Sequence, residues 1–342
     1  MRKFLNTLYI RDENTYLHRD GLNIVVEIDD EKRRFPIHYF ENIILFNYVG
    51  MSPALMELCM ENNVSVSFLS PFGKFRGKVE GPVRGNVLLR KEQYRISDDE
   101  SKSLLYAKNF MIGKFYNQRF RLNRGIRDHS LKIDIDLVRN IRDLMTDDLE
   151  VVQDIETSEG LLGLEGNNAK YYFMGLRELI LKEDETFTFL ERTRRPPLDP
   201  VNALLSFGYT LLTILAQGAL ETVGLDPYVG FYHKDRPGRV SLALDIIEEL
   251  RSYMVDSFIL ALINRRQFTA KDFWKKEDGA VLLTEKARDR FLLEWQKRLN
   301  TTINHPYLDE TIELGLLPYV QSLLLARTIR KDIEQYPPFF CK

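Results

Sequence analysis

The sequence has few of the residues from which covalent cross-links and soft metal sites are built. It contains only two cysteines among 342 residues, Cys59 and Cys341, and they lie far apart in the chain. This spacing argues against a disulfide framework and against a cysteine-based zinc site. The chain therefore fits a reducing compartment, and we expect a cytoplasmic protein.

An excess of charge of one sign is also missing. Lys and Arg number 48 and Asp and Glu number 50, so the formal net charge is −2. A near-neutral total does not predict a nucleic-acid binder, and any basic surface has to be local. No G-x-G-x-x-G or P-loop pattern is present, which weighs against a nucleotide cofactor. The first residues lack an apolar stretch of signal-peptide length, so export is not predicted.

Long uncharged runs are rare, and the one between Asp199 and Glu221 is long enough to suggest a membrane span. Polar side chains recur along it at steps of three or four residues, namely Asn202, Ser206, Thr210, Thr213 and Gln217. Because polar groups are costly in lipid, this pattern predicts a buried helix with one polar face. We therefore expect no association with a membrane.

The order of patterns along the chain predicts an α+β protein, with a β-rich, β-sandwich-like domain over residues 1–95. Short apolar runs there alternate with turn signals, among them Asp20-Gly21, which suits a tight hairpin. One helix interrupts the strands at 53–62, with Ser52 as its N-cap.

The remainder of the chain predicts a larger, all-α domain, which also holds the residues considered below as candidates for chemistry. A polar and acidic stretch at 96–103 is the predicted linker, and residues 104–342 form the helical domain. Turns are expected at several points within it, including the LEGNN stretch at 164–168.

Basic residues gather at 108–132, where seven Lys or Arg stand against one Asp and aromatic residues are interleaved. Such a patch could neutralise backbone phosphates of DNA. The alternative is a solvated helix face whose aromatic residues point into the core, and the sequence favours neither. The candidate DNA contacts in this segment are Lys114, Arg119, Arg121 and Arg124.

Two further pairs of arginines are candidates for DNA binding. Arg194 and Arg195 directly precede the uncharged helix, and Arg236 and Arg239 follow His233 in a loop rich in Gly and Pro. Arginine in such a setting could grip phosphate, or could pair with neighbouring carboxylates.

Carboxylates and a histidine supply the candidates for chemistry. Glu165 lies between two glycines, His233 lies in a loop, and Asp245, Glu248 and Glu249 share one face of a predicted helix. Each alone is ordinary: a helix-end charge, a lone loop histidine, an acidic helix turn. Together they form an oxygen-rich site with an imidazole, which suits Mn²⁺ or Mg²⁺ better than a closed zinc site. Spacing alone does not bring Glu165 to His233.

These residues also carry a resemblance to a known family. After the β-rich segment come, in order, EGNNAKYYF, RTRRPPLDPVNALLSFGYTLL and GLDPYVGFYHKDRPGRVSLALDIIEELRSYMVD. Over essentially the whole chain this order resembles that of the CRISPR adaptation integrases, the CRISPR-associated endonucleases of spacer acquisition. Any one block is a weak signal, but the combination is specific.

The resemblance implies a metal site made of a glutamate, a histidine and a second acid. Position by position, these are carried over as Glu165, His233 and Glu248, with Mn²⁺ or Mg²⁺ as the ion. Asp245, one helical turn before Glu248, is implied as a ligand or as a residue that orients the site. Whether Glu249 takes the place of Glu248 is left open, because the answer depends on the exact phase of the predicted helix. Asn202, in the block NALLSFGY, is implied as a supporting residue.

The same resemblance implies a partner set and a reaction. A homodimer, joined by a smaller second core adaptation protein, would hold a short DNA duplex, with the β-rich domain providing dimer and partner contacts. Each 3′-hydroxyl of that duplex would attack a phosphodiester at the end of a CRISPR repeat, and water as the nucleophile would give hydrolysis at the same residues.

Two other classes of function stay open. A non-catalytic nucleic-acid-binding scaffold would use the basic segment, and its DNA binding would fall steeply with salt without any metal-dependent strand chemistry. A helical metallohydrolase acting on a small phosphate ester would leave the basic segment without a role.

Overall fold

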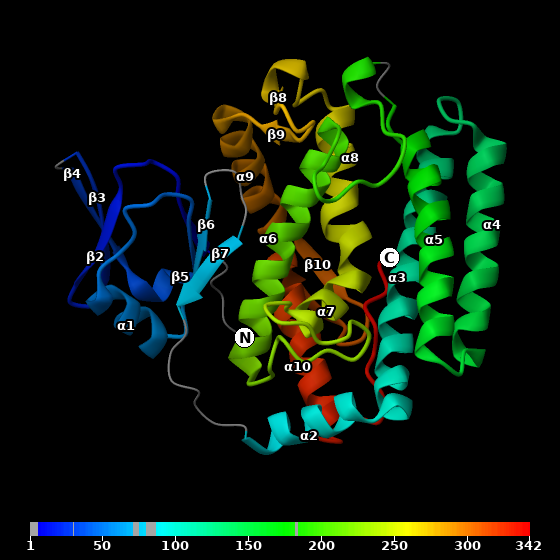
Figure 1. Ribbon diagram of the computed structural model, residues 1–342, viewed down its shortest axis with the longest axis horizontal. Coiled ribbons are helices and arrows are strands. Elements are labelled where there is room, and N and C mark those ends of the chain that lie inside the picture. Colours follow the sequence, from blue (N-terminus) through cyan, green and yellow to red (C-terminus); the bar gives the residue numbers. More distant parts are fainter. Residues whose placement is uncertain (1–5, 30, 71–74, 80–86, 182–183) are drawn as a thin grey trace. The chain divides into compact units, whose positions relative to one another are not determined.

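The structure is a computed structural model that describes residues 6–29, 31–70, 75–79, 87–181 and 184–342 (Figure 1). The chain divides into two compact units, residues 1–85 with 292–301 and residues 86–291 with 302–342. Strands dominate the first and helices the second, which confirms the predicted α+β class.

The described part of the first unit holds two sheets, one helix between the strands and the segment Leu292–Thr301. In one sheet β1 (Asn6–Ile10), β5 (Phe40–Leu45) and β6 (Ser65–Leu69) are parallel, and β7 (Phe75–Val79) runs antiparallel to β6. The other is an antiparallel meander of β2 (Tyr16–Asp20), β3 (Asn23–Ile28) and β4 (Glu31–Pro36).

One apolar core joins both sheets to α1 (Pro53–Glu61), as a sandwich-like domain requires. Leu17 and Ile24 from the meander, Ile43 from the parallel strands and Leu55 from α1 are all completely buried in it. The Ser52 side chain caps α1 by accepting a hydrogen bond from the Leu55 backbone, as predicted.

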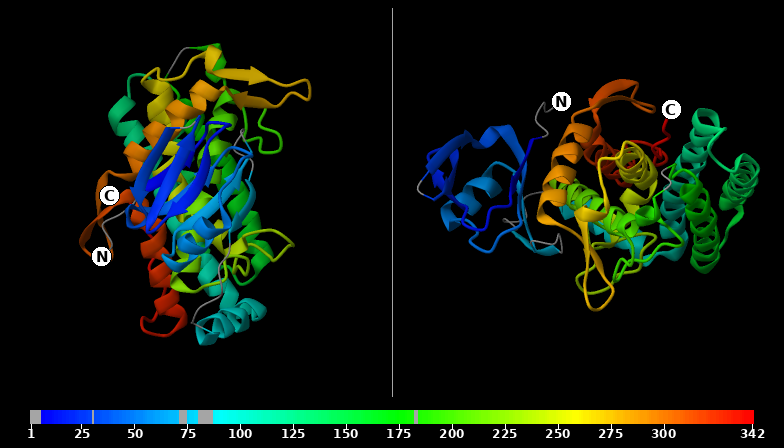
Figure 2. Two further views of the ribbon diagram at one scale, coloured as in Figure 1. Left: turned by 90° about the vertical axis from the view of Figure 1, so that its left-hand side faces the viewer. Right: turned by 90° about the horizontal axis from the view of Figure 1, so that it is seen from above.

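The second unit consists of helices and two small hairpins. The helices are α2 (Val87–Asp98), α3 (Glu100–His129), α4 (Ile135–Val151), α5 (Ser158–Glu178), α6 (Pro200–Val223), α7 (Ser241–Arg251), α8 (Ser257–Asn264), α10 (Leu317–Ile329) and the first half of α9 (Glu285–Leu299), whose residues from Leu292 on group with the first unit. The hairpins pair β8 (Phe273–Lys275) with β9 (Val281–Leu283), and β10 (Thr302–His305) with β11 (Glu310–Glu313), a departure from the expected all-α domain. The long α3 packs against α4, α5 and α7 (Figure 2).

Helices occupy most of residues 96–103, where an irregular linker was expected. Asp99 stands between α2 and α3, and its side chain accepts a hydrogen bond from the Lys102 backbone at 3.1 Å. The polar, acidic composition of this stretch is therefore helix-capping chemistry. The two compact units divide earlier, between Gly85 and Asn86.

The turn expected at 164–168 is also corrected, because α5 runs through it without a break. The helix begins at Thr157, whose hydroxyl accepts a hydrogen bond from the Gly160 backbone at 3.1 Å. Added β-carbons at Gly163 and Gly166 would meet nothing within 4 Å. These glycines are therefore tolerated on open sides of a helix that packing stabilises.

The uncharged helix α6 is a core helix of the second unit. Asp199 caps its start, and Gly224, with φ at 86°, ends it in the left-handed region. By length and composition it could cross a membrane, but 67% of its most apolar window is buried inside the protein. The predicted buried helix is confirmed.

Candidate metal site and DNA-binding loops

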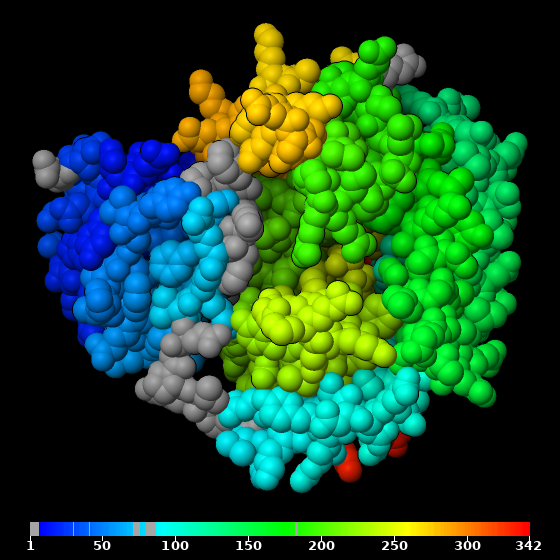
Figure 3. All heavy atoms as spheres, in the orientation of Figure 1, coloured from blue at the N-terminus to red at the C-terminus, as the bar shows by residue number. Residues whose placement is uncertain are grey.

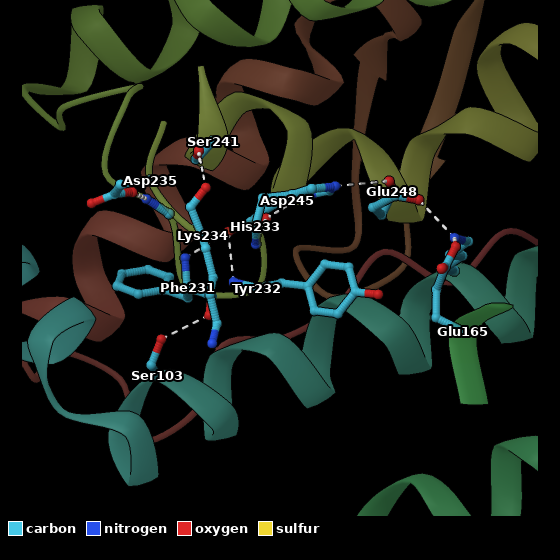
Figure 4. A network of polar contacts seen from close by, with 12 residues as sticks. Ser103, Glu165, Phe231, Tyr232, His233, Lys234, Asp235, Ser241, Asp245 and Glu248 are labelled. Carbon is cyan, nitrogen blue, oxygen red and sulfur yellow. Dashed lines mark hydrogen bonds and ion pairs between the residues drawn. The ribbon is translucent and has the colours of Figure 1, made fainter. Parts of the chain in front are cut away.

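Three elements that are distant in sequence bring Glu165 and Glu248 together (Figure 4). Glu165 comes from α5, Glu248 from α7, and the Lys114 side chain of α3 lies between them. The Lys114 amine contacts the Glu165 carboxylate and lies 2.9 Å from Glu248 Oε2. From the loop between α6 and α7, His233 Nε2 approaches Glu248 Oε1 to 4.0 Å. The structure therefore clusters the three residues that the resemblance selected.

Asp245 holds the histidine loop rather than pointing at the cluster. Its carboxylate accepts hydrogen bonds from the backbone amides of Phe231, Tyr232 and His233 at 2.7, 3.0 and 2.9 Å. Its Oδ1 also lies 2.7 Å from His233 Nδ1. A neutral histidine that donates from Nδ1 to this carboxylate presents Nε2 as its free nitrogen, the usual arrangement of a metal-binding histidine.

Close packing at Gly230 makes this loop geometry possible. A β-carbon there would lie 2.7 Å from the His233 carbonyl oxygen and 2.9 Å from Asp245 Oδ2. Both neighbours are fixed by hydrogen bonds, so a side chain at this position would push the loop away from α7.

Positive neighbours keep Glu248 ionised although it is only 3% exposed. Burial alone would raise the pKa of Glu248, but the positive charges of Arg251 and then Lys114 lower it to about 2. Arg251 Nη1 lies 2.7 Å from Glu248 Oε1. Oε2 lies 2.9 Å from the Lys114 amine, so a cation already faces this buried oxygen.

The carboxylate of Glu249 is bonded by other groups than those of the cluster. Its carboxylate accepts hydrogen bonds from Gln321 Nε2 at 2.8 Å, from the Phe339 backbone at 2.7 Å and from the Tyr336 hydroxyl. Burial raises the pKa of Glu249 to about 7. The helix phase therefore directs Glu248 toward Lys114 and Glu165. It directs Glu249 toward α10 and the C-terminal segment, the residues after α10 that include Tyr336 and Phe339.

Asn202, expected beside the site, instead shapes the loop before α6. Its side-chain oxygen accepts hydrogen bonds from Arg192 Nη1 at 2.7 Å and from the Thr193 backbone at 3.0 Å. Its amide donates to the Glu191 carbonyl at 2.8 Å. This residue therefore supports the loop that carries Arg194 and Arg195, and neither a ligand role nor a contact with the carboxylate cluster follows from its bonds.

Four arginines on two loops lie within electrostatic range of one another. Arg194, Arg195 and Arg236 are exposed and Arg239 is half-buried. Burial first, and then repulsion from the other three, lowers the pKa of Arg239, whereas Asp245 raises it. Figure 3 shows the two loops, in green and yellow-green, bordering a hollow on one face. This group of arginines lies close to Asp245, the residue that supports His233.

The basic segment of α3 is only partly exposed. Lys114 lies inside the carboxylate cluster, so its assignment as a surface DNA contact is wrong. Arg121 is half-buried, and burial lowers its pKa. The aromatic side chains include two that are completely buried, Phe110 and Phe115. The interpretation of these aromatics as core residues is therefore the correct one.

The other two candidates in α3 are bound by local partners. Arg119 lies 5.6 Å from the ring centre of Tyr116 and donates to Thr146 Oγ1 at 3.4 Å. Arg124 is exposed and pairs with Asp128 at 3.3 Å. Exposed pairs of this kind contribute little, so Arg124 is the candidate in this helix with the greatest freedom to bind a phosphate.

Sequence reasoning missed two residues of the site. Arg251 follows Glu248 by three positions, a helical spacing that could have identified it. It also stacks 5.0 Å from the ring centre of Tyr209, whose hydroxyl donates to Asp256 at 2.5 Å. Tyr232 precedes His233, and Figure 4 shows its ring pointing toward Glu165. Burial, and then the charges of nearby carboxylates, raises the pKa of Tyr232, so its hydroxyl stays protonated.

The residues fit a hard divalent cation in their chemistry. Glu165 and Glu248 supply carboxylate oxygens, His233 supplies an imidazole nitrogen, and an ammonium group already lies where the two carboxylates converge. Within the part of the chain that the structure describes, no three His, Cys, Asp or Glu side chains stand close enough to share one ion as they are arranged. The Lys114 amine lies between two of them.

Fold and site together define an α+β protein with a carboxylate and histidine cluster beside arginine-bearing loops. The family described as "CRISPR associated protein Cas1" matches residues 8–297. The chain belongs to this family, which confirms the resemblance seen in its sequence blocks.

Curated relatives cover the chain from end to end. The CRISPR-associated endonuclease Cas1 1 of Chlorobaculum tepidum is 45% identical over 340 residues, 99% of each chain. The CRISPR-associated endonuclease Cas1 2 of Rhodospirillum rubrum is 45% identical over 347 residues, 100% of each chain.

Solved structures share the fold. A casposase bound to an integration product has a TM-score of 0.82 at 23% identity, covering 99% of this chain and 95% of that one. A Cas1 protein from Thermotoga maritima has a TM-score of 0.81 at 23% identity, covering 95% of this chain and 97% of that one.

Proposed function

We propose that the protein is a metal-dependent DNA integrase and endonuclease of CRISPR adaptation. The observation that carries this proposal is the convergence of Glu165, His233 and Glu248 from α5, a loop and α7, beside four arginines. Membership of the Cas1 family, and the naming of its relatives as endonucleases, support the same reaction class.

In this proposal Glu165, Glu248 and His233 Nε2 hold one Mn²⁺ or Mg²⁺. When bound, the ion activates the attacking oxygen and offsets negative charge on the pentavalent phosphorus. Asp245 keeps the proton of the imidazole on Nδ1, so that Nε2 stays available. Arg251 keeps Glu248 charged and fixes its orientation.

The proposed substrate is double-stranded DNA. Arg194, Arg195, Arg236 and Arg239 bind its phosphates, because guanidinium groups match phosphate oxygens in shape and charge. A 3′-hydroxyl attacks a phosphodiester at the repeat end. One P–O bond forms, another breaks, and the proton of the attacking hydroxyl is lost while the leaving oxygen gains one. Water as the nucleophile gives hydrolysis.

We further propose that the protein works as a homodimer with a smaller second adaptation protein, in the cytoplasm. A chain in a structure described as a Cas6-RT-Cas1–Cas2 complex has the same fold, with a TM-score of 0.83 at 22% identity, covering 99% of this chain and 36% of that one. The β-rich unit is the proposed region of dimer and partner contact.

The test is joining of a short duplex with free 3′-hydroxyls into a supercoiled plasmid that carries a CRISPR repeat. With Mn²⁺ and the smaller partner, we expect wild type to join the strands. The rate of joining by His233→Ala should be lower by at least about a hundredfold, because a proposed metal ligand is removed. His129→Ala, at the end of α3, is the matched control. A folded wild type that binds Mn²⁺ but joins no strands would contradict the proposal.

The same protein preparation distinguishes the proposed integrase from a non-catalytic DNA-binding scaffold. DNA binding that falls steeply with salt, without any strand joining or cleavage, would favour it. A small phosphate ester that is hydrolysed, and that DNA does not inhibit, would favour the metallohydrolase alternative.

A further inference from the structure

Lys114 is the most deeply buried cation of the candidate site. Its side chain is 4% exposed, and its amine contacts Glu165 and Glu248 together. An ammonium group leaves water only where anions compensate it, so these two carboxylates determine where Lys114 lies. The position of the amine in turn marks the point on which the carboxylates converge.

The other charges of the site have other partners. Asp245 is neutralised by three backbone amides and His233, and Arg251 binds the Oε1 side of Glu248. Lys114 meets Oε2, the other oxygen of Glu248, at 2.9 Å. Without the ammonium group, Glu165 and Glu248 would face each other as like charges.

We propose that Lys114 is a positioning residue that occupies the cation site of the metal-free protein. Its ammonium group holds Glu165 and Glu248 charged and turned inward, and it competes with the divalent ion for both. This inference rests on the proposed function, because it requires that the two carboxylates bind metal. For these carboxylates to hold a divalent ion, Lys114 Nζ would have to leave at least one of them.

Removing the ammonium group has two effects of opposite sign. The metal-free protein loses stability, because the buried carboxylate of Glu248 and the partly buried carboxylate of Glu165 are left without the cation between them. The divalent ion binds more tightly, because a positive charge no longer competes with it. A purely structural lysine would instead give weaker metal binding once removed, and a lysine that only contacts DNA would leave metal binding unchanged.

The experiment titrates Mn²⁺ calorimetrically into the full chain, without DNA, for wild type and Lys114→Met, which keeps the length of the side chain and removes its charge. We expect the dissociation constant for Mn²⁺ to fall at least about tenfold in Lys114→Met. Its melting temperature without metal falls, and the rise on adding Mn²⁺ exceeds that of wild type.

Two matched variants complete the design. Lys114→Arg keeps the charge and is expected to bind Mn²⁺ no more tightly than wild type. Lys108→Met, six residues earlier in α3, removes a lysine that donates to the Gln153 carbonyl and is expected to behave like wild type.

Suppose that wild type binds Mn²⁺ and that folded Lys114→Met binds it equally well or more weakly. This result would overturn the inference about Lys114 but not the proposed function. If Lys114→Met unfolds without metal, recovery of its near-ultraviolet circular dichroism with Mn²⁺ supports the inference, and failure to recover overturns it. Absence of Mn²⁺ binding in every variant would overturn both the inference and the proposed function.

Discussion

Two neighbouring carboxylates on α7 show how one helix serves two environments. Glu248 and Glu249 are both almost completely buried, yet the pKa of Glu248 falls to about 2 and that of Glu249 rises to about 7. Cations surround Glu248, whereas neutral donors from α10 and the C-terminal segment surround Glu249. Burial alone therefore does not distinguish these two acids. The charge of the neighbouring groups does, because it decides whether the pKa falls or rises.

The largest expected difference comes from neutralising each of these two acids in turn. Glu248→Gln should lower strand joining by about a thousandfold or more, because a charged ligand is lost. Glu249→Gln should leave joining within about fivefold of wild type in the folded protein, since its carboxylate bonds only structural groups. The measurement is single-turnover joining with Mn²⁺. Equal losses in the two variants would remove the distinction.

A smaller effect is expected at the support of the histidine. Asp245→Asn should weaken Mn²⁺ binding by about 10- to 100-fold, because His233 loses its charged partner and its fixed tautomer. Calorimetry measures the affinity, and ¹⁵N NMR of the imidazole reports the tautomer. Asp235→Asn, in the exposed part of the same loop, is the control. Unchanged affinity with an unchanged tautomer would show that the backbone amides alone hold the loop.

The raised pKa of Glu249 makes a prediction about stability and pH. A carboxyl group whose folded pKa of about 7 exceeds its ordinary value of 4.5 stabilises the fold most below pH 4.5, and this contribution is lost as pH rises through 7. Relative to Glu249→Gln, wild type should therefore lose about 3 kcal/mol between pH 4 and 8. Urea unfolding across this range measures it. A constant difference would mean that folding leaves the pKa of Glu249 at its ordinary value.

The smallest effect is expected at a single donor to Glu249. Tyr336→Phe should cost about 1 kcal/mol of unfolding free energy, because one buried hydrogen bond to the carboxylate is lost. Strand joining should not change, since the tyrosine lies on the structural side of α7. Chemical unfolding and the joining assay, made on the same preparation, test both statements. A loss of joining would connect the C-terminal segment to the chemistry.

Sequence reasoning reached the family, the fold class and the three clustered residues, because these depend on local order and on motif combinations. It failed where a choice of helix face or a tertiary contact decides the outcome. Lys114 looked like a surface cation because composition does not report which side of α3 faces α5 and α7. Glu249 could not be separated from Glu248, since a step of one residue turns a helix by about 100°.

The glycines around Glu165 misled the turn prediction for a related reason. Gly163 and Gly166 weaken a helix locally, but the packing of α5 on α3 and α4 compensates for the loss. Asn202 was placed on the correct polar stripe of α6, yet the stripe meets the Arg192 loop at that end of the helix.

Between α7 and α8 the chain forms one π-helical turn, Ser252–Asp256, which lets the two helices continue with a shifted phase. Asp256, at its end, accepts hydrogen bonds from Tyr172 and Tyr209. Deleting one residue in this turn would restore ordinary α-helical winding, because a π-turn holds one residue more than an α-turn. The helices before and after it would keep nearly the same phase, so a one-residue deletion should be better tolerated here than within α7, where it would turn the following residues by about 100°.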